Sequence, residues 1–238
     1  MKVTLISTTP EAKELLLFTK ATRLTFSPAL LDDIRAWPES KKLEELKYMA
    51  NTIPSSWEFV DYVFLVEGVS RAYTHQQVRT RNASYAQQSM RVLEMNKFDY
   101  VFTDANTKEP RAMEALKSVL DEIRMAYGRL LEVGQVPEDA RGILPTNIAT
   151  NIVCKFNLRT LSELAKSRTG GRTQNEYQRV INAMIDAALE VHPWAVDFLF
   201  NRPRDYFEEL EAFAKEKFPD LKERGELLKI VDAMRKER

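Results

Sequence analysis

The residues from His75 to Arg91 constrain the fold of this chain more than any other segment, because they are poorly suited to a hydrophobic core. These seventeen residues include three arginines, four glutamines and two serines, and no aspartate or glutamate. The arginines therefore have no acidic partner nearby in the sequence. Guanidinium groups match phosphate oxygens in bidentate geometry, so we expect the segment to lie at the edge of a rigid scaffold and to bind a phosphate-bearing ligand.

The composition predicts a soluble, folded, cytoplasmic protein. The chain has 238 residues, 44% of them hydrophobic, which is enough for a substantial core. Its 35 basic and 35 acidic residues balance, so any anion site has to be local. The lone Cys154 excludes an internal disulfide, and two histidines argue against a metal centre. No apolar run approaches the roughly 20 residues of a membrane span.

Hydrophobic periodicity predicts an α+β fold. Strands are expected where β-branched and aromatic residues concentrate, at 2–7, 58–67 and 147–156, with Gly68 closing the second, and a helix is the alternative at 147–156. Helical patterns occupy the ranges 11–22, 28–37, 39–50, 69–78, 108–133, 157–168, 174–191 and 204–238. The polar segment after residue 78 is predicted to be an arginine-rich loop. Glu176 lies three residues after Thr173, the spacing of a helix capping box.

The chain carries no internal repeat, low-complexity tract or long flexible linker. A single domain over residues 1–238 is therefore the simplest prediction, with 203–238 as a helical C-terminal appendage. The sequence also lacks GxGxxG, GxxxxGK[ST], HExxH and GxSxG, the commonest nucleotide, metal and serine-hydrolase motifs. What remains is two groups of arginines with amide and hydroxyl neighbours, from Gln76 to Arg91 and from Arg141 to Arg172.

Arg79-Thr80-Arg81, followed by seven residues and then Ser89, resembles the Arg-His-Arg signature of the flavin-dependent thymidylate synthases, the ThyX family. The likeness covers roughly residues 54 to 188. It includes Glu67-Gly68-Val69-Ser70-Arg71, His75-Gln76, Arg141 before Leu144-Pro145, Asn157-Leu158-Arg159, Arg168 and Gln174-Asn175-Glu176.

The resemblance implies a ThyX-like fold, with a mixed central sheet flanked by helices, and a homotetramer whose active sites are shared between subunits. It also implies a reaction in which FAD, reduced by NADPH, serves the transfer of a one-carbon unit from methylenetetrahydrofolate to C5 of dUMP. A nucleotide monophosphate and a flavin dinucleotide are ligands that need several arginines.

By position, the resemblance assigns site residues. Cofactor-binding residues are Ser55, Glu58, Arg79, Thr80, Arg81, Asn82, Asn157, Arg159, Glu163 and Arg172. Nucleotide-binding residues are Gln76, Arg79, Gln87, Gln88, Ser89, Arg91, Arg141 and Arg168. The catalytic candidates are Arg168, whose guanidinium would stabilise charge on the pyrimidine carbonyl, and Ser89. Ser89 fits better as a phosphate or base contact than as a nucleophile, since the sequence offers it no histidine base.

Three expected histidines are missing, because Thr80 interrupts the signature, Phe59 follows Glu58, and Ile53 stands five residues before that glutamate. Fewer imidazoles near the ligands leave fewer groups to handle protons. Two alternatives stay open beside thymidylate synthesis: hydroxymethylation of dUMP or dCMP, and non-catalytic binding of a nucleotide or single-stranded nucleic acid. Neutral charge and the absence of an aromatic platform count against nucleic acid.

Overall fold

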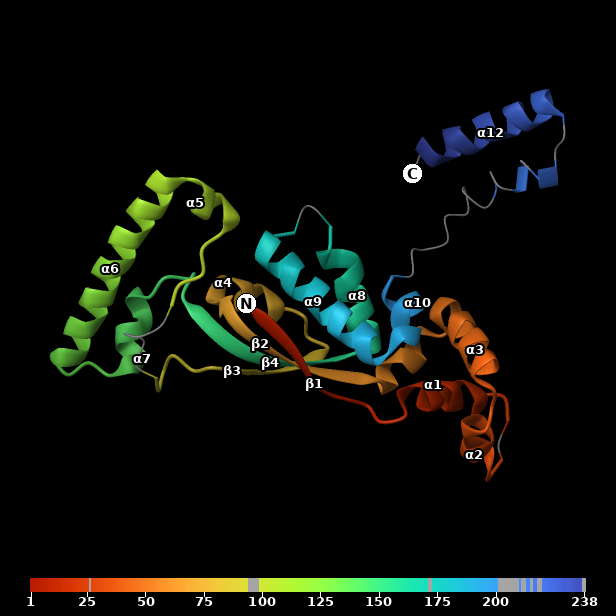
Figure 1. Cartoon of the computed structure of the whole chain (residues 1–238), viewed down its shortest axis with the longest axis horizontal. Coiled ribbons are helices and arrows are strands. Elements are labelled where there is room, and N and C mark those ends of the chain that lie inside the picture. The colour runs from red at the N-terminus through yellow and green to blue at the C-terminus, as the bar shows by residue number, and fades with distance from the viewer. Residues whose placement is uncertain are drawn as a thin grey trace. The chain divides into compact units, whose positions relative to one another are not determined.

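A four-stranded sheet organises the first of two compact units, Met1–Phe200 and Asn201–Arg238 (Figure 1). This computed structural model describes residues 1–25, 27–93, 99–170 and 173–200 and, in the second unit, 210, 213–214, 216–217 and 220–236. The prediction of one domain with a C-terminal appendage stays a prediction. Within the described chain, no helix combines the length and the apolar character that crossing a membrane requires.

The sheet has the strand order β1-β2-β4-β3. Its strands are β1 (Lys2–Thr8), β2 (Asp61–Ser70), β3 (Ala83–Gln87) and β4 (Ala149–Asn157). All three pairings are antiparallel. The predicted α+β class is confirmed, but the expected mixed sheet is wrong in this respect, because each strand runs opposite to the neighbours it bonds.

Most predicted helices are confirmed within a few residues. The helical elements of the first unit, predicted or not, are α1 (Ala12–Ala21), α2 (Leu30–Arg35), α3 (Glu39–Thr52), η1 (Pro54–Phe59), α4 (Arg71–Gln77), α5 (Asp104–Lys108), α6 (Pro110–Glu132), α7 (Pro137–Ala140), η3 (Arg141–Ile143), α8 (Leu158–Arg168), α9 (Asn175–Val191), η4 (Pro193–Ala195) and α10 (Val196–Leu199). The second unit contains α12 (Leu221–Lys236), within the predicted C-terminal helical segment. The helix expected at 108–133 instead begins at Pro110, a residue suited to the first helical turn.

The prediction that Gly68 ends the second strand is wrong. Strand β2 continues to Ser70 because Gly68 adopts a left-handed φ of 65° and an irregularity in the β2–β4 register falls between Val66 and Val69. The Gly68 N–H donates to the Asn151 side-chain oxygen at 3.0 Å. The strand therefore delivers the chain directly into α4.

The predicted arginine-rich loop is also wrong in part, because Ala83–Gln87 forms edge strand β3. Ala83 pairs with Phe156 and Tyr85 with Cys154 on β4. The Tyr85 ring lies edge-on to Phe156, with centroids 6.0 Å apart. Pairing along one side is sufficient for an edge strand, so the segment needs little hydrophobic content of its own.

The main core lies between one face of the sheet and the helices α8 and α9. Tyr62, Phe64 and Val66 alternate along β2 and are fully buried, as the two-residue period of a strand requires. On α9, Val180, Ile181, Met184 and Ile185 belong to the same buried cluster. Cys154 is buried among them, and burial raises the pKa of its thiol to about 12. This thiol is a packing group rather than a nucleophile.

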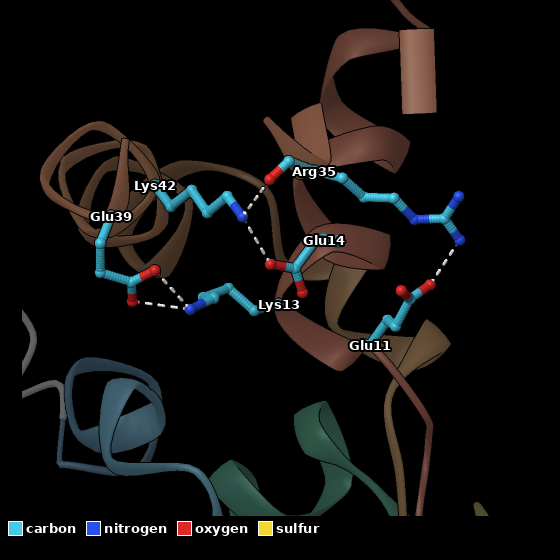
Figure 2. Close-up of polar contacts among 6 residues, drawn as sticks. All are labelled: Glu11, Lys13, Glu14, Arg35, Glu39 and Lys42. Atoms are coloured by element: carbon cyan, nitrogen blue, oxygen red, sulfur yellow. Dashed lines mark hydrogen bonds and ion pairs between the residues drawn. The ribbon is translucent and has the colours of Figure 1, made fainter. Parts of the chain in front are cut away.

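A set of ion pairs joins α1, α2 and α3 (Figure 2). The Lys42 ammonium donates to the Glu14 carboxylate at 2.8 Å and to the Arg35 carbonyl oxygen at 2.9 Å. Burial alone would raise the pKa of Glu14, but the hydrogen bond and charge of Lys42 outweigh it, so that the pKa is lowered. Lys13 with Glu39, and Arg35 with Glu11, form more exposed pairs around this contact.

Lys42→Ala should lower the free energy of unfolding by about 2–3 kcal/mol, because Glu14 loses the cation that compensates its burial. The value is below that of a fully buried pair because the Lys42 and Glu14 side chains remain 8% and 16% exposed. The matched control Lys13→Ala, whose partner Glu39 is 59% exposed, should cost less than about 1 kcal/mol. Urea denaturation measures both. Equal losses would contradict this account.

Candidate functional site

A polar pocket of about 400 Å³ lies beside the first residues of β3 and the start of α8, and we call it the β3–α8 pocket. Its volume is in the range of small-molecule sites. Ten residues from four parts of the chain line it: Glu58, Asp61, Asn82, Ala83, Ser84, Lys155, Asn157, Arg159, Thr160 and Glu163.

The wall of this pocket is fixed by a helix cap. Asn157 ends β4, and its side-chain oxygen accepts the Thr160 N–H at 2.8 Å, which caps α8. The Thr160 hydroxyl donates to the carbonyl oxygen of Asn82 at 3.1 Å. Asn82 and Asn157 are therefore held by rigid elements, as a binding site requires.

The cations of the β3–α8 pocket have acidic partners. Arg159 contacts Glu58 at 2.7 Å and Glu163 at 3.3 Å, and the hydrogen bond that it donates to Glu58 is the main cause that raises the pKa of the Arg159 guanidinium. Lys155 pairs with Asp61 at 2.9 Å. These pairs are exposed, so a bound anion or a ribose hydroxyl could replace either partner at little cost.

The structure gathers five of the ten predicted cofactor residues into this pocket. They are Glu58, Asn82, Asn157, Arg159 and Glu163. Four others do not line it: Ser55, Arg79, Thr80 and Arg81. The Ser55 hydroxyl accepts from Arg23 at 3.1 Å, and neither Arg79 nor Arg81 forms an ion pair with a described residue. The predicted Arg172 lies outside the described residues.

A second site surrounds the end of β3, and we call Arg71, Arg91 and Arg141 the arginine cluster. Arg71 donates to the carbonyl oxygen of Gln88 at 3.3 Å. Its Nε is buried without a hydrogen-bond partner within the described chain, and so is the side-chain oxygen of Gln88. Burial and the like charge of Arg141 both lower the pKa of the Arg71 guanidinium. Two close guanidiniums with unused hydrogen-bonding capacity favour an anionic ligand.

Three more predicted nucleotide residues lie in this region. Arg91 contacts the Glu138 carboxylate at 2.7 Å, and Arg141 donates to the Glu138 carbonyl oxygen at 3.0 Å. The Ser89 hydroxyl accepts the Arg91 N–H at 3.2 Å, in a turn, and no described residue serves it as a general base. This supports a contact role for Ser89 over a nucleophilic one. Arg71 was not among the predicted site residues. It belongs to the motif from Glu67 to Arg71, and its position after Ser70 in that motif is the signal that could have identified it.

Glu176 does not form the predicted capping box, because the N-cap of α9 is Gln174 and no side chain caps it. The Glu176 carboxylate instead accepts the Ser70 N–H at 2.7 Å and the Ser70 hydroxyl at 2.6 Å. The Ser70 oxygen in turn caps α4 by accepting from Tyr73. Glu176 therefore fixes the start of α4, and with it Arg71.

The predicted nucleotide residues Gln76 and Gln87 contact neighbouring elements. The Gln76 amide donates to Gln174 at the start of α9. The Gln87 amide donates to the Thr74 hydroxyl at 2.8 Å, which joins β3 to α4. The Gln76 side chain therefore links α4 to the start of α9, and the Gln87 side chain links β3 to α4.

The predicted catalytic residue Arg168 is exposed at the end of α8, with its guanidinium carbon 5.2 Å from the centre of the Tyr177 ring. Tyr177 is fully buried, and its hydroxyl has no hydrogen-bond partner among the residues that the structure describes. Leaving a buried hydroxyl unsatisfied costs about 1–3 kcal/mol. Nothing in the sequence except helical periodicity distinguished Tyr177.

Comparison with known proteins decides the family. The family model described as "Thymidylate synthase complementing protein" matches residues 4–194, which include both sites. The chain belongs to the flavin-dependent thymidylate synthase family. The resemblance found in the sequence is therefore confirmed.

Relatives named "Flavin-dependent thymidylate synthase" match most of the chain. That of Nitratidesulfovibrio vulgaris is 34% identical over 209 residues, covering 81% of this chain and 84% of its own. That of Clostridium tetani is 28% identical over 211 residues with the same coverage. That of Thermococcus onnurineus is 38% identical over 126 residues, about half of each chain.

In this member of the flavin-dependent thymidylate synthase family, backbone hydrogen bonds hold Thr80, the residue at which the side chain departs from the family signature. The Thr80 N–H donates to the Gln77 carbonyl at 3.0 Å, and the Thr80 carbonyl accepts from the Tyr85 hydroxyl at 2.9 Å. Phe59, at another expected histidine, is 56% exposed beside Glu58. Across the described part of the chain, no cluster of histidine, cysteine and carboxylate side chains could hold a metal ion.

Arg71→Gln should weaken the binding of inorganic phosphate about tenfold or more, because a charged hydrogen-bond donor to the anion is lost. Isothermal titration with phosphate measures the affinity. Arg35→Gln is the control, since that guanidinium is exposed and already paired with Glu11 and Asp32. An unchanged affinity in Arg71→Gln would contradict an anion site at the arginine cluster.

Proposed function

We propose that the chain is an enzyme that transfers a one-carbon unit from methylenetetrahydrofolate to C5 of dUMP, with FAD as cofactor and NADPH as reductant. The observation that carries this proposal is the arrangement of β3 in a member of this family. The strand begins at the β3–α8 pocket, next to Asn82, and ends at the arginine cluster, next to Gln88. Asn82 and Gln88, which flank the strand, are six residue steps apart, or roughly 20 Å at the rise of a strand.

The donor set of the β3–α8 pocket fits a flavin dinucleotide. Arg159 and Lys155 suit pyrophosphate oxygens, and the carboxylates of Glu58 and Glu163 suit ribose hydroxyls. The exposed ring of Phe59 offers an apolar surface beside them. When bound, FAD would supply the hydride chemistry that no side chain here performs.

The arginine cluster fits the phosphate of a nucleotide monophosphate. Arg71 and Arg141 would neutralise its charge, and the unused side-chain oxygen of Gln88 would accept from the ligand. Ser89 and Arg91, at the edge of the same region, would complete the contact. These groups orient the nucleotide and contribute binding energy away from the reacting carbon.

Arg168 is the residue that we assign to the chemical step. Attack at the pyrimidine ring places negative charge on a ring carbonyl oxygen, and a guanidinium held against that oxygen stabilises the charge. The cation–π contact with Tyr177 limits the positions that Arg168 can take. Arg168 is a stabilising group, since a guanidinium stays protonated and cannot serve as a base.

The departures at Ile53, Phe59 and Thr80 favour a second candidate, a flavin- and folate-dependent hydroxymethylase of dUMP or dCMP. None of these three side chains titrates, so proton handling around the transferred carbon has to differ from a site with imidazoles. Water rather than hydride would then complete the reaction.

Anaerobic incubation with reduced FAD, methylenetetrahydrofolate and dUMP should yield a product with the mass of a methylated nucleotide. Arg168→Ala should reduce its rate by at least about a hundredfold, the effect of removing a transition-state charge partner. Mass spectrometry reads the product. A hydroxymethyl product, or a product from dCMP alone, would select the second candidate. No product, or full activity in Arg168→Ala, would contradict the respective assignment.

We further propose a homotetramer whose active sites are completed by neighbouring copies. Helix α6 supports this, because Val119 and Met125 are more than half exposed on a long amphipathic helix. Arg79 and Arg81 support it too, since both are exposed and unpaired among the described residues.

Light scattering of the purified chain should give about four times the 27.5 kDa mass of one copy. Met125→Glu should shift this toward smaller species, because a charge in an apolar interface is costly to bury. Asp186→Lys, on the exposed side of α9, is the control and should leave the mass unchanged. A monomeric wild-type protein would contradict the proposed assembly.

A further inference from the structure

The buried hydroxyl of Tyr177 is not explained by packing. Tyr177 lies in the first turn of α9, and its ring meets that of Tyr73 edge-on, with centroids 5.3 Å apart. A phenylalanine would make the same ring contact without burying an unsatisfied hydroxyl. Such a group in a folded protein points to strain, to a bound molecule or to a role in the site.

The neighbours of this hydroxyl are two site residues. The guanidinium carbon of Arg168 lies 5.2 Å from the centre of the Tyr177 ring. Thr80 belongs to the same group of contacts, because the Tyr85 hydroxyl donates to the carbonyl oxygens of Thr80 and Gln77, and Gln77 accepts from Tyr73, whose ring meets that of Tyr177. Burial raises the pKa of Tyr177, and Thr80 and Arg168 lower it. Thr80 is the residue at which the chain departs from the family signature, and Arg168 is assigned above to the chemical step. A guanidinium only donates hydrogen bonds, whereas a phenol donates one and accepts others. The phenol can therefore connect the two.

We propose that Tyr177 is a positioning residue that couples Arg168 to Thr80 in the nucleotide complex. The ring holds the guanidinium through its face, and the phenol oxygen accepts an N–H from Arg168. The phenol O–H then donates to the Thr80 hydroxyl. The proposal rests on the proposed function, because the nucleotide is what brings the guanidinium of Arg168 to this position.

In this coupling, the hydroxyl of Thr80 acts as the hydrogen-bond partner of the Tyr177 hydroxyl. A threonine hydroxyl can accept a hydrogen bond from the phenol O–H and still donate its own O–H to a further acceptor. Arg168 gains a fixed orientation, which matters because one edge of its planar guanidinium has to face the carbonyl oxygen. Tyr177 itself does not touch the substrate in this arrangement.

A double-mutant cycle on dUMP binding tests the coupling. Isothermal titration of Tyr177→Phe should give about three- to tenfold weaker binding, the effect of one hydrogen bond. Arg168→Gln should weaken binding further. Adding Tyr177→Phe to Arg168→Gln should cause no additional loss, since the hydroxyl acts through Arg168.

Thermal unfolding separates this role from a structural one. Tyr73→Phe is the matched control, because the buried Tyr73 hydroxyl donates to the Gln77 side-chain oxygen at 3.0 Å. Tyr73→Phe should lower the melting temperature, whereas Tyr177→Phe should leave it unchanged or raise it.

Three results would overturn the proposal: unchanged dUMP affinity in Tyr177→Phe, losses that add in the double variant, or a melting temperature lowered as in Tyr73→Phe with affinity intact. A folded wild-type protein that does not bind dUMP would overturn the proposed function and this proposal together. Normal wild-type binding with additive losses would overturn the coupling alone.

Discussion

The pairing of β4 with β2 on one side and β3 on the other is the interaction on which the rest of the first unit depends. Asn157 is both the last residue of β4 and the N-cap of α8. Because β3 pairs along β4, the polar segment that could not enter a core is placed against Asn157 at one end and Asn151 at the other. One central strand thereby positions both candidate sites.

The order of apolar and polar residues within a segment was sufficient to predict those strands and helices that have a strong pattern of their own. Strands β2 and β4 are rich in β-branched and aromatic residues, and α6 and α9 carry clear apolar stripes. Strand β3 was missed because its five residues carry a weak pattern, and pairing with β4 rather than propensity makes it a strand. Glu176 was misassigned for a similar reason, since its partner Ser70 is 106 residues away in the sequence.

The residues of the candidate sites also form two groups, those that could be identified from the sequence and those that only the folded chain reveals. The resemblance to the family identified Glu58, Asn157 and Arg159, and the fold brings them to one pocket. No spacing could show that the arginine cluster lies at the other end of β3. Arg71 and Tyr177 were missed because their distinguishing feature, a buried polar atom without a partner among the described residues, exists only in the folded chain. Whether a polar atom is buried without a partner depends on contacts between segments that are far apart in the sequence.

We propose that strand β3 joins the flavin site to the nucleotide site, so that binding of one ligand changes the surroundings of the other. The most direct measurement is the absorption spectrum of the FAD-reconstituted protein during titration with dUMP. The account predicts a saturable change in the flavin band, and no change with deoxyuridine at the same concentrations, because deoxyuridine lacks the phosphate that the arginine cluster holds. A protein that fails to bind FAD, or whose flavin spectrum is insensitive to dUMP, would contradict it.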